Sequence, residues 1–143
     1  MTILIAAVAG ILMQTAAPDT GWTWTLYEGE GPLVLANEVP DTPNLRSTLE
    51  CQPGSGVARV SLYGPSLGSG VARASSGERS ATTEADGSRR DKTSMSLRTD
   101  HPVFTQFIAN GALAVSVADR SQTLTVERPH LPKLRRFAEL CGG

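Results

Sequence analysis

Few side chains in this chain of 143 residues suit acid–base or metal chemistry. The two histidines, His101 and His130, lack a second ligand at a metal spacing such as i+4, and no CxxC pair is present. Both are interpreted as ordinary surface residues. No serine lies in a Gly-x-Ser-x-Gly elbow, although a Ser-His-Asp triad can assemble from distant positions. The sequence therefore predicts no catalytic residue, no metal site and no cofactor.

The charged residues form small clusters of mixed sign. Glu28 and Glu30 would share one face of a strand, for which a solvated sheet edge is the ordinary explanation. Arg89, Arg90 and Lys92 form a short basic cluster that neighbouring acidic residues offset. A solvated turn is the default interpretation of this cluster, and contact with an anion is the alternative. The formal net charge of −1 argues against a general nucleic-acid binder.

A six-residue segment, Gly-Ser-Gly-Val-Ala-Arg, occurs at 54–59 and again at 68–73. A Gly-x-Gly pair can let the backbone approach a phosphate group. Here the third glycine of a nucleotide-binding loop is missing, and an alternating strand rather than a helix follows each copy. The two copies are therefore predicted to be successive turn-then-strand units of a meander.

The two cysteines, Cys51 and Cys141, are candidates for a single disulfide. Cys51 lies at an inward position of an alternating strand, and Cys141 lies on the apolar stripe of a helix predicted at 131–141. In an oxidising compartment the simplest arrangement is one bond between them, and two separate buried thiols are the alternative. Closing a loop of about 90 residues would stabilise the fold by about 4 kcal/mol.

Period-2 alternation predicts seven or eight short strands, which involve residues 22–27, 33–36, 45–52, 58–63, 80–85, 93–99, 113–117 and 124–126. Asp100 is the expected N-cap of a short helix that has Pro102 in its first turn and stops at Asn110-Gly111. The predicted fold is mainly β: an antiparallel β-sandwich or partly open barrel, with a short internal helix and a C-terminal helix.

Trp22 and Trp24 are two residues apart, so they point to the same side of the first strand. Core packing is the favoured interpretation of this pair, and a platform for stacking a ligand is the alternative. Arg59 and Tyr63 lie on the outward side of the hairpin at 44–63. Together, Trp22, Trp24, Arg59 and Tyr63 form the candidate binding surface.

The first residues have the pattern of an export signal. Ile3 to Met13 is an uncharged apolar run, too short for a helix that crosses a bilayer about 30 Å thick. Thr15-Ala16-Ala17 then offers small residues for a signal peptidase, although no Lys or Arg precedes the apolar run. We expect a signal peptide at 1–17 and one disulfide-linked β domain at 18–143, located in the periplasm or secreted. A retained membrane anchor and a buried N-terminal strand are the alternatives.

Two segments, "VPDTPNLRSTLECQPGSGVARVSL" and "PVFTQFIANGALAVSV…LPKLRRFAELC", resemble small exported proteins of alphaproteobacteria. Those proteins have an early tryptophan strand, a C-x-P-G-x-G hairpin and a terminal F-x-x-x-C helix. The matching positions here are Trp22, Cys51, Pro53, Gly54, Gly56, Phe137 and Cys141. The tail is also loosely similar to periplasmic β-sandwich proteins related to invasion-associated locus B. The resemblance covers structural residues, so it implies no catalytic residue.

The sequence therefore favours an exported, non-catalytic domain that binds another envelope protein or a surface polymer. Contact with a membrane is expected only through the signal segment. One alternative is a carrier of a small apolar ligand, with a cavity near Trp22 and Trp24. The other is a hydrolase whose site assembles at His101 or His130.

Overall fold

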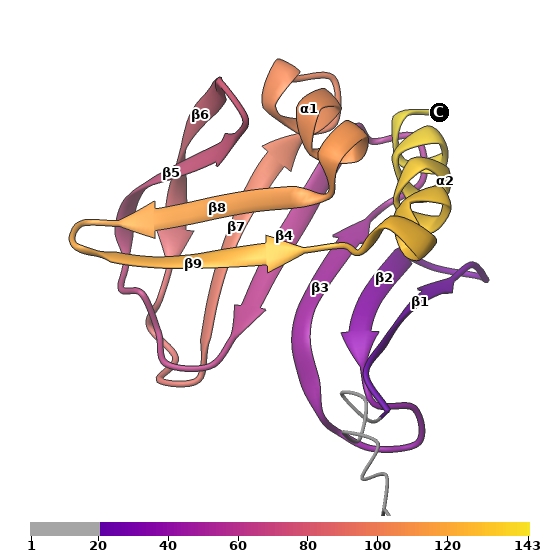
Figure 1. The fold of residues 1–143 in the computed structure, drawn as a ribbon, viewed down its shortest axis with the longest axis horizontal. Helices are drawn as coiled ribbons and strands as arrows, with labels where there is room; N and C mark the ends of the chain where they lie inside the picture. The colour runs from indigo at the N-terminus through magenta and orange to yellow at the C-terminus, as the bar shows by residue number, and fades with distance from the viewer. Residues whose placement is uncertain (1–20) are drawn as a thin grey trace, which may run out of the picture.

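The computed structural model describes residues 21–143, in which antiparallel strands form one sheet (Figure 1). The strands are β1 (Thr23–Tyr27), β2 (Leu33–Glu38), β3 (Leu45–Cys51), β4 (Val57–Tyr63), β5 (Gly70–Ser76), β6 (Arg79–Asp86), β7 (Lys92–Arg98), β8 (Ala112–Val117) and β9 (Arg120–Thr125). Helix α1 (Pro102–Asn110) connects β7 to β8, and a short 3-10 turn, η1 (Arg128–His130), leads into helix α2 (Leu131–Gly142). The predicted fold class is confirmed. The expected signal peptide at 1–17 lies outside the described residues.

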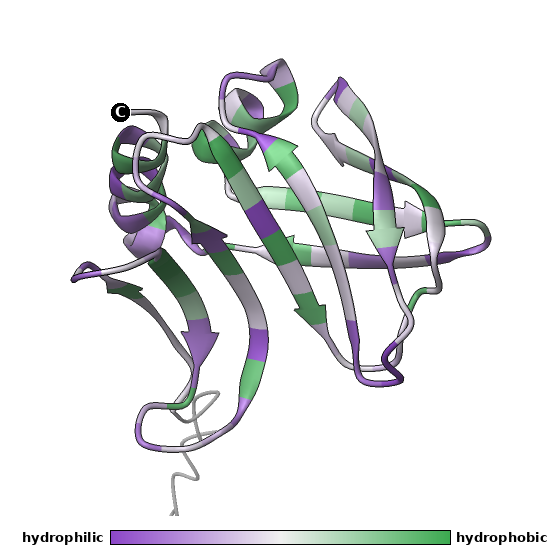
Figure 2. Cartoon of the chain, turned by 180° about the vertical axis from the view of Figure 1, so that it is seen from behind, coloured by the Kyte–Doolittle hydropathy of each residue, from purple (hydrophilic) through white to green (hydrophobic). Residues whose placement is uncertain are grey.

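The sheet curls into a half-barrel, which brings its two edge strands towards each other. Figure 1 shows β8 and β9 crossing in front of β4 and β7. The inner face of the sheet and the two helices enclose one core, whose largest fully buried side chains are Trp24, Phe104, Phe107 and Phe137. Figure 2 shows hydrophobic and hydrophilic residues alternating along the strands, and it shows both kinds of residue on α2. This is expected where one face of each element is buried.

The strand order, β1-β2-β3-β4-β7-β6-β5-β8-β9, differs from the predicted meander. Each Gly-Ser-Gly-Val-Ala-Arg segment does supply a turn followed by a strand, but the two strands, β4 and β5, are not neighbours. β4 pairs with β7 instead, over seven residue pairs. The β6–β7 ladder has two pairs, Ala85 with Met95 and Asp86 with Ser94. A ladder this short permits the sheet to curl sharply between its two halves.

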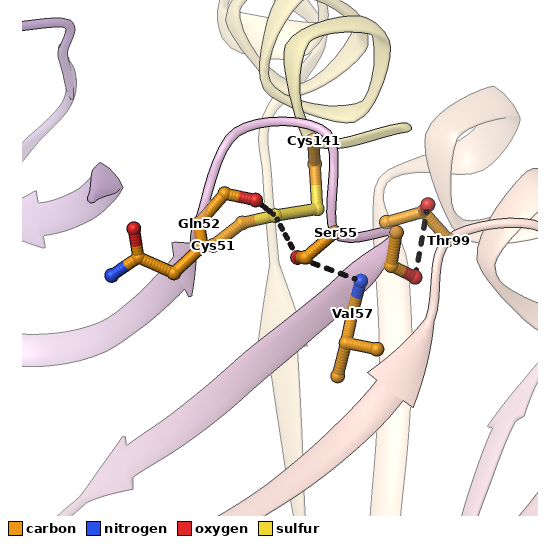
Figure 3. The surroundings of a disulfide bond; sticks show 7 residues. Cys51, Gln52, Ser55, Val57, Thr99 and Cys141 are labelled. Atoms are coloured by element: carbon orange, nitrogen blue, oxygen red, sulfur yellow. Dashed lines mark hydrogen bonds between the residues drawn. A yellow bond between two sulfur atoms is a disulfide. The ribbon is translucent and has the colours of Figure 1, made fainter. Parts of the chain in front are cut away.

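A disulfide and two backbone hydrogen bonds attach α2 to the β3–β4 hairpin. Cys51 and Cys141 are bonded, with their Cα atoms 5.7 Å apart (Figure 3). The N–H groups of Gly54 and Gly56 donate to the carbonyls of Leu140 and Cys141 at 3.1 and 2.8 Å. The last carbonyls of a helix have no partner within the helix, so the hairpin turn caps α2. The predicted disulfide is confirmed.

Helix α1 begins at a histidine cap, so the prediction of Asp100 as the N-cap is wrong. The Nδ1 atom of His101 accepts the N–H of Val103 at 3.0 Å. Asp100 is engaged elsewhere, because the Arg98 guanidinium donates to both of its carboxylate oxygens at 2.9 Å. This contact lowers the pKa of Asp100 and raises that of Arg98. The imidazole, one residue closer to the helix, takes the capping role.

Candidate functional site

The candidate site lies where the two edges of the curled sheet approach each other without pairing. Trp24 in β1 donates from Nε1 to the carbonyl of Thr125 in β9 at 3.2 Å. Lys133 in α2 donates from Nζ to the carbonyl of Trp24 at 2.5 Å. Gln122 in β9 donates from Nε2 to the carbonyl of Tyr63 at the end of β4, at 3.4 Å. Side-chain bonds rather than a backbone ladder therefore hold β9 against β1 and β4.

Between β9 and strands β2 to β4 lies a cleft of about 210 Å³, which we call the mouth cleft. Every residue that lines it carries a charged, amide or hydroxyl group: Asn37, Arg46, Ser47, Tyr63, Gln122, Thr123, Thr125 and Glu127. One cation and one anion, Arg46 and Glu127, contribute opposite charges. This lining matches a ligand rich in hydrogen-bonding groups better than an apolar one, because apolar ligands bind in mostly hydrophobic pockets.

Two polar side chains of the mouth cleft are almost entirely buried. Asn37 is 8 % exposed and Ser47 is 5 % exposed. They face each other across β2 and β3, in an inward row that runs from Trp24 through both residues to Leu62. Within residues 21–143, neither side chain has a hydrogen-bond partner. Thr48 Oγ1 is the buried side-chain atom without a partner among the described residues, so the polar atoms of Asn37 and Ser47 reach the surface of the cleft, where a ligand can bind them.

A β-bulge accounts for the position of Arg46. Asn37 faces Ser47 in the β2–β3 ladder, whereas the next residue, Glu38, faces Leu45. Arg46 is therefore the extra residue of β3, opposed by no residue of β2. Bulges re-aim side chains, and here the bulge lets an outward-position arginine line the mouth cleft. Its guanidinium carbon also lies 4.0 Å from the centre of the Trp22 ring, a cation–π contact.

A second hollow, of about 310 Å³, adjoins the mouth cleft. We call it the aromatic hollow; it shares Tyr63 with the cleft, and its lining is Trp22, Pro43, Asn44, Leu45, Tyr63, Gly64 and Asp91. Trp22 is partly exposed in this hollow and stacks on Arg46 from the cleft. The two recesses together form a continuous polar and aromatic surface along one end of β3 and β4.

The four residues predicted as a binding surface do not lie together. Trp24 is 1 % exposed and belongs to the core, as the core-packing interpretation states, whereas that interpretation is wrong for Trp22, which is half-buried and packs on Arg46. Trp22 and Tyr63 share the aromatic hollow. Arg59 is exposed on the outer face of β4, opposite Glu50, and lines a separate hollow. Trp22 and Tyr63 therefore adjoin the site, whereas Trp24 supports it from within.

Each of the two histidines contacts another residue of its own helix region. His101 caps α1, and Nδ1 of His130 lies 3.3 Å from Nζ of Lys133. Neither lines the mouth cleft. Residues 21–143 hold no group of three or more His, Cys, Asp or Glu side chains arranged to bind a metal ion. Glu28, one of the two clustered carboxylates, accepts a hydrogen bond from Nε of Arg136 at 2.8 Å.

The sequence prediction missed Asn37, Arg46 and Ser47. A signal for two of them exists: Ser47 and Asn37 occupy inward positions of strands whose other inward residues are Leu33, Leu35, Leu49 and Cys51. Two polar residues at such positions in consecutive strands indicate a hydrated or ligand-binding part of the interior. Arg46 gives no such signal, because a bulge does not alter the sequence pattern.

Comparisons of the chain with protein families, with curated proteins and with solved structures yield no match. In the described part of the chain, no helix has both the length and the apolar character needed to span a membrane.

Proposed function

We propose that this chain is an exported, non-catalytic domain that binds a surface polymer in the mouth cleft. The carrying observation is the pair of nine-tenths-buried polar side chains, Asn37 and Ser47, which face the cleft without a partner in the described residues. Their polar atoms reach the surface of the cleft, where a ligand hydroxyl can form one hydrogen bond with each, and such a bond contributes about 0.5–1.5 kcal/mol. Export is supported by the disulfide, because such bonds persist in oxidising compartments.

A polymer fits this surface better than a protein partner or an apolar ligand. The cores of protein interfaces are depleted of charged residues and enriched in aromatic and apolar area, whereas the mouth cleft is lined by hydroxyl, amide and charged groups. An apolar carrier would use a cavity beside the tryptophans, but Trp24 packs into the core. Polyhydroxylated ligands suit donors and acceptors placed beside an aromatic ring, as Trp22 and Tyr63 provide.

The test is binding of the purified, oxidised protein to envelope polysaccharide that has been treated with protease, measured by isothermal titration calorimetry. Asn37→Ala and Ser47→Ala each remove one hydrogen-bonding group from the cleft. We expect each to weaken binding about two- to tenfold, because one hydrogen bond contributes about 0.5–1.5 kcal/mol. The matched control is Ser96→Ala, which removes a hydroxyl from the exposed outer face of β7.

Wild-type affinity for the deproteinised fraction that falls in both cleft variants and not in Ser96→Ala would support the proposal. Capture only by fractions that protease destroys would replace the polymer with a protein partner. Equal affinity of all three variants would show that the mouth cleft is not the binding site.

A further inference from the structure

Resting on the proposed function, we infer that the polymer is an acidic glycan. Its carboxylate groups bind in an arginine-lined hollow that continues from the mouth cleft. This arginine hollow has a volume of about 390 Å³. Arg89 and Arg90 reach it from the β6–β7 loop, and Arg120 reaches it from the first position of β9.

Positive charge is concentrated in the arginine hollow beyond what the composition predicts. The chain has 13 Lys and Arg against 14 Asp and Glu, for a net charge of −1. The hollow, in contrast, is lined by three arginines, and its other lining residues are proline, glycine and serine. Asp91 beside it pairs with Arg89, their Nε and Oδ1 atoms being 3.6 Å apart. A recess with one sign of charge attracts anions.

Hydrogen bonds between the β4–β5 loop and the β6–β7 loop fix the backbone that lines the arginine hollow. Ser66 Oγ donates to the carbonyl of Gly87 at 2.7 Å and accepts the N–H of Gly68 at 3.0 Å. A Cβ at position 87 would lie 2.2 Å from the carbonyl oxygen of Gly68, so this close crossing of two backbones requires glycine. The loop that carries Arg89 and Arg90 is thereby held in place, and a pre-organised site loses less entropy on binding.

Arg120 connects the arginine hollow to the mouth cleft. Its NH1 group donates to the carbonyl of Ser66 at 3.0 Å, which fixes the guanidinium at the rim and leaves other N–H donors for a ligand. Gln122, two residues along β9, projects to the same side and lines the mouth cleft. A recess of about 500 Å³ lies between the two sites, because it shares Arg120 with the arginine hollow and Gln122 with the mouth cleft. A chain-like ligand can therefore occupy them together.

Guanidinium groups favour a carboxylate-bearing polymer. Arginine presents a planar fork of donors that matches a carboxylate in two parallel hydrogen bonds. The mouth cleft supplies amides and hydroxyls for sugar hydroxyl groups, and the arginine hollow supplies the counter-charge for acid groups on the same chain. A polyuronate has both kinds of group along one backbone.

The experiment measures binding of the oxidised full chain to polygalacturonate oligomers and to their methyl esters, which keep the sugar backbone and lose the charge. We expect polygalacturonate to bind at least about tenfold more tightly, with affinity that falls as salt rises. Arg90→Gln and Arg120→Gln should each lose about tenfold in affinity for the acid form and little for the ester. Arg79→Gln, an equal charge change on exposed β6, is the control. Circular dichroism checks folding, and Arg120→Lys replaces Arg120→Gln if the latter is unfolded.

Equal binding of acid and ester by the wild type, or equal losses in Arg90→Gln and Arg79→Gln, would overturn the acidic-glycan assignment. The proposed function would survive that result if Asn37→Ala and Ser47→Ala still weakened binding of envelope polysaccharide. Loss in the arginine variants without loss in the two cleft variants would instead overturn the proposed cleft and leave a separate anion site. Tighter binding of duplex DNA or polyphosphate than of polygalacturonate would overturn the glycan class.

Discussion

Three buried hydroxyl groups lie on the outer face of the sheet, and they differ in whether they have a hydrogen-bond partner. Ser61 and Ser94 lie opposite each other on β4 and β7, and their Oγ atoms are 3.0 Å apart in a buried hydrogen bond. Thr48 lies opposite Ser61 on β3 and is 4 % exposed, yet its Oγ1 has no hydrogen-bond partner among the described residues. The first arrangement compensates for burial of the hydroxyls and the second does not.

Thr48→Val should therefore stabilise the protein. Valine has almost the same shape, fits a β-strand and removes a buried hydroxyl that lacks a partner, so we expect a gain of about 1 kcal/mol in the free energy of unfolding. Urea unfolding measures it. Ser61→Ala is the contrasting variant, because it strips Ser94 of its partner and should lower the free energy of unfolding by about 1 kcal/mol. A Thr48→Val variant less stable than the wild type would show that the hydroxyl is bonded after all.

At the residue scale, the sequence identified the parts of the site that make a strong local pattern. Trp22 was selected because it and Trp24 fall on one side of a predicted strand, and Tyr63 because it lies on the outward side of the hairpin at 44–63. Asn37 and Ser47 were missed because a single polar residue in a short strand is common, and its importance depends on what lies across the sheet. Their significance arises from the register that sets them side by side, with β9 leaving a gap beside them.

At the element scale, local patterns predicted the strands and helices but not their neighbours. Alternation indicated the β3–β4 hairpin with its Pro53–Gly56 turn, and the Leu134, Phe137 and Cys141 stripe indicated the buried face of α2. The pairing of β4 with β7 could not be predicted in the same way, because it joins residues more than thirty positions apart, such as Ser61 and Ser94. Such pairings depend on how the whole sheet packs around α1 and α2.

The histidine cap of α1 gives a test at this scale. His101→Ala removes the acceptor of the Val103 N–H and should destabilise the protein by about 1 kcal/mol in urea unfolding. His101→Asn should retain most of the stability, because an asparagine side chain also accepts at an N-cap. The control is His130→Ala, since His130 precedes α2 without a side-chain capping bond. Equal losses in His101→Ala and His101→Asn would contradict the capping role.

At the scale of the whole molecule, the fold is held together by different bonds at the two ends of β3. Near Leu45 the half-barrel is left open, and side-chain bonds such as Trp24 to Thr125 hold its edges around the mouth cleft. Near Cys51 the fold is closed covalently by the disulfide to α2, assisted by the hairpin that caps this helix. This separation predicts that stability and ligand binding can be changed independently.

Replacing both cysteines, Cys51→Ser with Cys141→Ser, tests that separation. The disulfide spans 90 positions, and releasing a loop of that size enlarges the unfolded ensemble, so we expect a loss of about 4 kcal/mol in the free energy of unfolding. The unfolded chain also becomes less compact, which should raise the denaturant m-value. Reduction of the wild type with dithiothreitol should reproduce both changes. Affinity for the envelope polysaccharide, measured where the variant is still folded, should stay within about twofold, because the disulfide and the mouth cleft lie at opposite ends of β3. A twofold change corresponds to about 0.4 kcal/mol in the free energy of binding. A parallel loss of affinity in the folded variant would mean instead that the disulfide positions the mouth cleft through β3.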